Sequence, residues 1–124
     1  MRIGRVHGHK VEILPGRDGK LSVQDVLACA QRCRDSGGAE YLTRPALVCI
    51  FFPTESGTLC SLEELEALSA VCRRFGMMLF ADGARMSYGL MADGCDVTLK
   101  DFGRLADAFY LGGTKCGAMF GEAP

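Results

Sequence analysis

The sequence predicts an α/β fold in which a mainly parallel sheet has flanking helices. Along the 124 residues, short apolar segments of strand length alternate with longer segments whose apolar residues recur every three or four positions. Two of the short segments are apolar almost throughout, which is typical of strands buried on both faces of a parallel sheet. No internal repeat or low-complexity segment interrupts the alternation, so we expect one domain or part of one.

The first strand and helix are expected in the N-terminal third. Lys10–Leu14 (KVEIL) predicts a short strand, which ends at the turn residues of PGRDGK. Ser22 is a candidate helix N-cap with Asp25 three residues later, and apolar residues then keep to one face as far as about Arg34. The helix should end at DSGG, where a glycine can adopt the left-handed conformation that closes a helix.

The central segments carry the strongest patterns. Residues 46–52 (ALVCIFF) predict a strand that is buried on both faces. Ser61 and Glu64 have the spacing of a capping box, and apolar residues follow at helical spacing until Gly76 ends the helix. MMLFAD then predicts a further buried strand that ends on Asp82.

Three shorter elements are expected in the C-terminal third. DVTLKDFGRL predicts a short capped helix, DAFYL a strand, and CGAMFG one more short strand after Lys115. Parallel sheets bind ligands just beyond the carboxyl ends of their strands. Asp82 and Lys115 each follow a buried strand, so we expect both at that edge.

Composition argues against several classes of function. The net charge is −1 without a long run of one sign, whereas binding to nucleic acids or anionic membranes requires a basic stripe. No apolar run is long enough to cross a bilayer and no secretory signal is present, so we expect a cytoplasmic protein with no nucleic-acid or membrane partner. The seven cysteines lack any CxxC pair, which favours small buried hydrophobic residues over a metal or redox site.

A single lysine, Lys115, lies in the small and apolar segment GGTKCGAMFG. A lysine in such a place would lose hydration, which disfavours its charged form and frees the amine for Schiff-base chemistry. Pyridoxal phosphate also needs a carboxylate that keeps its ring nitrogen protonated, and Asp82 in FADGAR is the candidate. Alone, each motif also has a structural interpretation, as an Asp-Gly turn or a solvated loop lysine. The spacing does not match a nucleotide-binding P-loop.

The quoted motifs together carry a resemblance to a known family. FFPTESGTLCSLEELEALSAVCRRFGMMLFADGARMSYGL, followed by DVTLKDFGRLADAFYLGGTKCGAMFGEA, resembles the low-specificity threonine aldolases, which are beta-eliminating lyases of the fold type I pyridoxal-phosphate enzymes. The resemblance runs from about GHKVEIL to the last residue. It implies that residues 1–124 are part of the cofactor-binding large domain, without the N-terminal phosphate-turn region and the C-terminal small domain.

The resemblance also implies the roles of four residues. Lys115 would form the internal aldimine with pyridoxal 5'-phosphate, and Asp82 would pair with its pyridinium nitrogen. Arg85 would lie near the cofactor's phenolic oxygen or the substrate carboxylate, and Thr114 would help hold the phosphate. The implied reaction cleaves a small β-hydroxy amino acid, threonine or allo-threonine, to glycine and acetaldehyde. The full-length enzyme is expected to be a homo-oligomer.

Departures from the family leave two alternatives open. Another type I lyase that acts by beta-elimination would use Asp82 and Lys115 equally well. The second alternative is a truncated, catalytically silent domain. Two observations favour it: the phosphate turn and the ring-stacking histidine of the family are absent, and Phe52 replaces an asparagine that relatives carry near the cofactor. His7 and His9 are expected to be ordinary hydrogen-bonded histidines. Unpaired strands and an exposed dimer interface would give marginal stability and an apolar patch.

Overall fold

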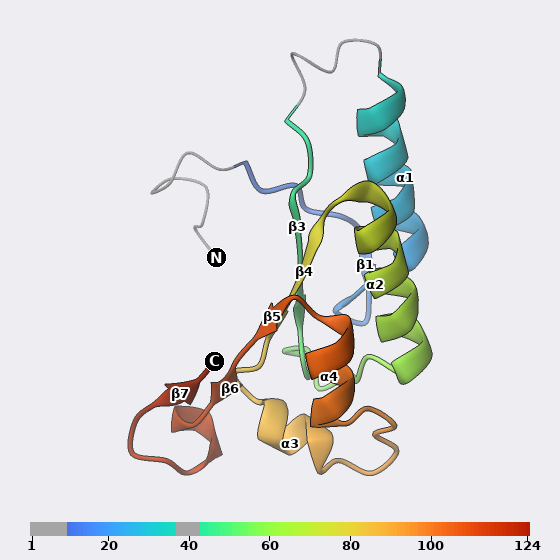
Figure 1. The fold of residues 1–124 in the computed structure, drawn as a ribbon. Helices are drawn as coiled ribbons and strands as arrows, with labels where there is room; N and C mark the ends of the chain where they lie inside the picture. The colour runs from blue at the N-terminus through green and yellow to red at the C-terminus, as the bar shows by residue number, and fades with distance from the viewer. Residues whose placement is uncertain (1–9, 37–42) are drawn as a thin grey trace.

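A three-stranded parallel sheet in the order β3-β4-β5 forms the centre of the fold in the computed structural model (Figure 1), which describes residues 10–36 and 43–124. β3 (Leu47–Phe51) and β4 (Met78–Asp82) pair along their whole length, with Leu47 opposite Met78 and Phe51 opposite Asp82. β5 (Ala108–Phe109) pairs with the second half of β4. The predicted α/β fold with a parallel sheet is confirmed.

The helices begin and end where local sequence signals place them. α1 (Val23–Asp35) has Ser22 as its N-cap, and α2 (Leu62–Phe75) has the full capping box of Ser61 and Glu64. α2 ends at Gly76, which adopts the left-handed conformation with φ of 66°. α4 (Leu99–Leu105) has a second capping box. The glycines expected to close α1 lie outside the described residues, and the described cap is Ser36.

Two predicted strands are wrong. Lys10–Leu14 forms no strand, because the described residues offer it no neighbouring strand to pair with. The turn that follows does form, as a hairpin of β1 (Gly16–Arg17) and β2 (Lys20–Leu21). CGAMFG is also not a strand, because Gly117 and Gly121 have φ of 92° and 110° and break the extended backbone.

The C-terminal third differs from the expected helix and two strands in three further ways. DAFYL divides into β5 and β6 (Leu111–Gly112), and β6 belongs to a separate antiparallel sheet with β7 (Glu122–Ala123). A short 3₁₀ turn, η2 (Thr114–Cys116), lies between them. A five-residue helix, α3 (Met86–Leu90), follows β4 and had no clear signal in the sequence.

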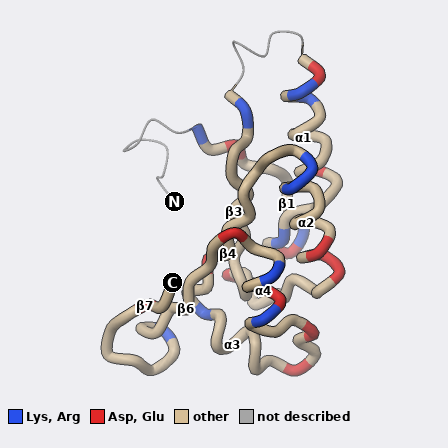
Figure 2. The backbone as a smooth tube through the Cα atoms, viewed as in Figure 1, with Lys and Arg blue, Asp and Glu red and all other residues tan. Residues whose placement is uncertain are grey.

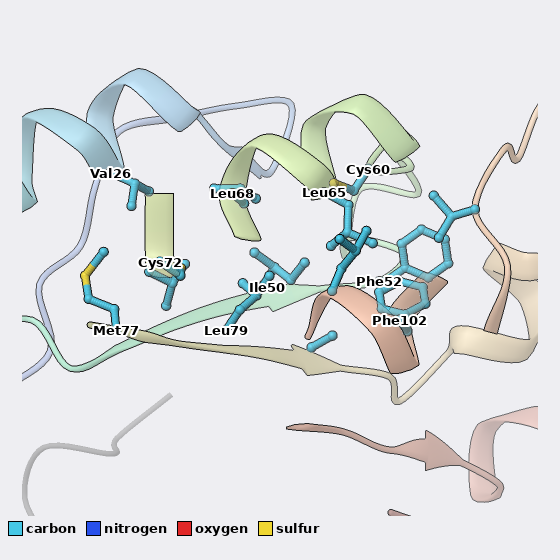
Figure 3. Packing of buried hydrophobic residues seen from close by; sticks show 14 of the residues in the cluster. Val26, Ile50, Phe52, Cys60, Leu65, Leu68, Cys72, Met77, Leu79 and Phe102 are labelled. Carbon is cyan, nitrogen blue, oxygen red and sulfur yellow. The ribbon is translucent and has the colours of Figure 1, made fainter. Parts of the chain in front are cut away.

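The hydrophobic core lies between the helices and one face of the sheet (Figure 3). Its largest fully buried side chains include Phe52 and Phe102, whose rings meet edge to face with centroids 4.8 Å apart. The strands contribute alternate residues, as expected for a pleated sheet. The other core residues shared by strands and helices include Val48, Ile50, Leu79, Ala81, Val26, Leu65, Leu68 and Cys72.

The opposite face of the sheet is open, which corrects the prediction of strands buried on both faces. Leu47, Phe51 and Met78 are 52%, 38% and 55% exposed. The described helices supply their buried side chains to the other face, so nothing in residues 10–36 and 43–124 covers these three. The open face is therefore an apolar surface that ends, at the carboxyl edge of β4, with Asp82.

Only two of the seven cysteines are buried and the other five are partly exposed, which corrects the expectation that most of them are buried. Cys60 and Cys72 are buried, and burial raises the pKa of their thiols to about 12 and about 11, so they stay protonated and unreactive. All seven cysteines are free, and no metal-ligand cluster occurs among the described residues. Basic and acidic residues are interspersed along the chain (Figure 2). None of the described helices is long and apolar enough to cross a bilayer.

A buried hydrogen bond joins α2 to the end of α4. The Ser69 hydroxyl donates to the carbonyl oxygen of Leu105 at 2.7 Å, and Ser69 is 2% exposed. Ser69→Ala leaves that carbonyl without its donor, so we expect the free energy of unfolding to fall by about 1–2 kcal/mol. Urea denaturation with an unchanged m-value measures this. Ser87→Ala, at an exposed position of α3, is the control, and equal midpoints for both variants would contradict the assignment.

Candidate active site

Asp82 is the last residue of β4 and its carboxylate is held through one oxygen. Alternation along β4 puts Asp82 on the open face of the sheet, with Met78 and Phe80. Oδ1 accepts a hydrogen bond of 2.6 Å from the Tyr110 hydroxyl and one of 3.1 Å from the backbone N–H of Ala84. No described residue donates to Oδ2. The half-buried carboxylate thus keeps one oxygen available to a ligand.

Arg85 lies in the turn that follows Asp82. It is the N-cap residue of α3, and its carbonyl oxygen accepts from the backbone N–H groups of Tyr88 and Gly89 at 3.0 and 3.2 Å. Its side chain is half-buried and forms no ion pair with the described residues. The guanidinium is therefore not committed to another group in this part of the chain.

Thr114 and Lys115 lie in η2, two and three residues after β6. Both side chains are exposed, which corrects the expectation that Lys115 is dehydrated by its small neighbours. The reason is that small residues around it leave space which no described element fills. No hydrogen bond or ion pair among the described residues joins Lys115 to Asp82 or Arg85.

Direct backbone contact nevertheless joins the two segments that carry these residues. The backbone N–H of Gly112 donates to the carbonyl oxygen of Gly83 at 3.0 Å. A Cβ atom on Gly112 would lie 2.7 Å from the Cα and carbonyl oxygen of Ala84, and one on Gly83 would lie 1.8 Å from the carbonyl oxygen of Tyr110. Only glycine fits at both positions. The turn after β4 is therefore in direct backbone contact with β6, the strand that precedes Lys115.

Phe52, which the sequence raised as a departure near the cofactor, does not join this site. Phe52 is fully buried in the core against Phe102, on the face of the sheet opposite to Asp82. Its backbone N–H donates to the carbonyl oxygen of Asp82 at 3.0 Å. Position 52 lies in the hydrophobic core, where an apolar ring packs against Phe102. His7 and His9 lie outside the described residues.

Sequence reasoning did not identify Tyr110 or the two glycines. Tyr110 follows Phe109, which pairs with Ala81, so the pairing of β5 with β4 brings its side chain next to Asp82. The signal in the sequence is only a tyrosine near a strand end. The register between β4 and β5 places this tyrosine next to Asp82. The sequence of either strand alone does not predict that register.

Comparison with known proteins identifies the family. A sequence model described as beta-eliminating lyase matches residues 2–121. The chain belongs to the beta-eliminating lyase family. The resemblance carried by the motifs around Asp82 and Lys115 is thereby confirmed.

Several proteins that are similar to this beta-eliminating lyase chain are threonine aldolases. The low-specificity L-threonine aldolases of Pseudomonas aeruginosa and of another Pseudomonas species are each 32% identical over 117 residues, which cover 94% of this chain. A solved structure of Leishmania major threonine aldolase is 45% identical, with a TM-score of 0.85 over 94% of this chain. In all three cases the chain spans 33% of the relative's own length.

The glycine contact at this site gives a direct test. Gly112→Ala would force a methyl group against the backbone of Ala84, so we expect it to lower the free energy of unfolding by about 2 kcal/mol. Gly103→Ala is the matched control, because that glycine is exposed in α4 with no atom within 4 Å of the added Cβ. It should stabilise the helix by up to about 1 kcal/mol. Urea midpoints that shift in the same direction for both would contradict the contact.

Proposed function

We propose that this chain forms the cofactor-binding centre of a pyridoxal-phosphate-dependent aldolase that cleaves threonine or allo-threonine to glycine and acetaldehyde. The observation that carries the proposal is the Asp82 carboxylate, which has one oxygen held by two donors and one oxygen open. Its turn rests on the strand that leads to Lys115. Residues 1–124 would be part of the large domain, since the chain spans 33% of its relatives.

The residues present fit the chemical groups of pyridoxal phosphate. Asp82 offers an open carboxylate oxygen to the ring N–H, and Arg85 offers an uncommitted guanidinium to the phenolic oxygen or the substrate carboxylate. Thr114 offers a hydroxyl to the phosphate, and Lys115 an accessible amine to the aldehyde. When bound, the cofactor supplies an electron sink for the bond that breaks between the α and β carbons of the substrate.

The names of the relatives support the substrate class. Both Pseudomonas proteins are called low-specificity L-threonine aldolases, and the Leishmania protein a threonine aldolase. We propose a small β-hydroxy amino acid as the substrate, and a homo-oligomeric cytoplasmic enzyme as the full-length form. A lyase that acts by beta-elimination is the second candidate, because Asp82 and Lys115 suit both reactions and the family is described by that chemistry.

A catalytically silent domain is the candidate of another class. It is favoured by the exposure of Thr114 and Lys115 and by the open apolar face that carries Leu47 and Met78. These features mean that the described residues alone do not exclude water from the amine. Cofactor capture by this chain distinguishes the silent domain from both lyases.

The decisive experiment is reduction of the chain with borohydride in the presence of pyridoxal phosphate, followed by peptide mapping of its four lysines. We expect the pyridoxyl group to be found on Lys115, and the visible absorption of the bound cofactor to be lost in Lys115→Ala and weakened in Asp82→Asn. Lys100→Ala is the control, because Lys100 is exposed and has no ion pair among the described residues. Lys20 is unsuitable, since it pairs with Glu64 at 2.8 Å.

Two further results separate the candidates. Equal labelling of Lys100 and Lys115 would favour the silent domain and overturn cofactor capture by this chain. If Lys115 is labelled selectively, incubation with L-threonine distinguishes the two lyases by their products. Aldol cleavage gives acetaldehyde and glycine, whereas beta-elimination gives 2-oxobutanoate and ammonia.

A further inference from the structure

We propose that Tyr110 is a positioning residue, whose hydroxyl holds Oδ1 of Asp82 so that Oδ2 faces the ring nitrogen of pyridoxal phosphate. The proposal rests on the function proposed above and adds a residue to it. Tyr110 lies between β5 and β6, directly after the residue that pairs with Ala81. It would not touch the reacting atoms, and it would act only through Asp82.

The hydrogen bonds of Asp82 distinguish its two oxygens. The Tyr110 hydroxyl is 2.6 Å from Oδ1, a distance typical of a hydrogen bond to an ionised carboxylate. The backbone N–H of Ala84 donates to the same oxygen at 3.1 Å. An ionised carboxylate offers about four lone-pair sites over its two oxygens. The described residues therefore donate to Oδ1 and leave Oδ2 without a donor.

The ring and the backbone of Tyr110 each have a contact of their own. It stacks on Phe80, with ring centroids 6.2 Å apart and an interplanar angle of 27°. Its carbonyl oxygen lies where a Cβ on Gly83 would clash, so the backbone of Tyr110 is in direct contact with the Asp82 turn. Because backbone and ring are both held, the hydroxyl has little freedom to leave the carboxylate. That restraint is what a positioning group requires.

The hydroxyl remains a donor at neutral pH. The hydrogen bond to Asp82, then burial, and then the negative charge of Asp82 raise the pKa of Tyr110 to about 12. A pKa raised by folding means that the contribution to stability is complete below pH 10 and is lost as pH rises toward 12. A hydroxyl committed in this way is not available as an acid or base for the substrate.

A test without cofactor examines the hydrogen bond itself. In the full chain labelled with ¹³C at the tyrosine ζ carbon, Tyr110→Phe assigns the Tyr110 signal. We expect Asp82→Asn to move the onset of Tyr110 ionisation at least one pH unit lower, and to change its ζ-carbon shift already at pH 7. Tyr88, which is exposed, serves as the internal control. Identical Tyr110 signals at pH 7 in wild type and Asp82→Asn would overturn the hydrogen bond and the proposal with it.

A second test examines the action on the ring nitrogen. We expect Tyr110→Phe to raise the Kd for pyridoxal phosphate roughly fivefold, and Tyr88→Phe to leave it unchanged. The effect should vanish in the Asp82→Asn background, and for 1-deazapyridoxal phosphate, which has no ring nitrogen. A loss of equal size for both cofactors would show a structural role and overturn the proposal.

The two tests separate this inference from the proposed function. If the wild-type chain binds no pyridoxal phosphate, the proposed function fails for this chain, and the part of the inference that concerns the ring nitrogen is overturned. The carbon shifts still decide whether Tyr110 holds Asp82. If the cofactor binds and Tyr110→Phe has no effect, the function stands and the inference is wrong.

Discussion

The direct backbone contact between Gly83 and Gly112 is the constraint on which the arrangement of the site depends. At 3.0 Å between the N–H of one and the carbonyl oxygen of the other, no side chain fits between the turn after β4 and strand β6. Asp82 precedes this turn and Lys115 follows that strand. Two residues that are 33 positions apart are thereby carried by segments in contact, and neither residue has to contribute to that contact.

The two faces of the sheet carry different features, the hydrophobic core on one and the candidate site on the other. One face packs against the helices and holds the core, including Phe52 and Phe102. The other face carries Asp82 and Tyr110, together with exposed apolar residues such as Met78. The core residues therefore lie on one face, and the residues of the candidate site lie on the other. Phe52 illustrates this, since a residue considered for its effect on the pocket proves to be a core residue.

Outside the site, Glu64 makes polar contacts with two different elements. Glu64 closes the capping box of α2 and also pairs with Lys20 of the β1-β2 hairpin at 2.8 Å. Its pKa is lowered, because the hydrogen bonds from Lys20 and Ser61 outweigh the opposing effect of burial. The pair is partly exposed, so it contributes little to stability by itself. Its value is to tie the N-terminal hairpin to the start of a central helix.

The sequence alone determined the elements whose signals are local. The caps at Ser22 and Ser61, the end of α2 at Gly76, and strands β3 and β4 all depend on residues within one turn or one strand. The family motifs around Asp82 and Lys115 were readable for the same reason. Only the tertiary structure decided which face of the sheet is covered, and that the segments 10–14 and 116–121 are not strands. It also brought Tyr110 to Asp82. Strand register and close backbone contacts form between segments that are distant in the sequence, and the local sequence of neither segment predicts them.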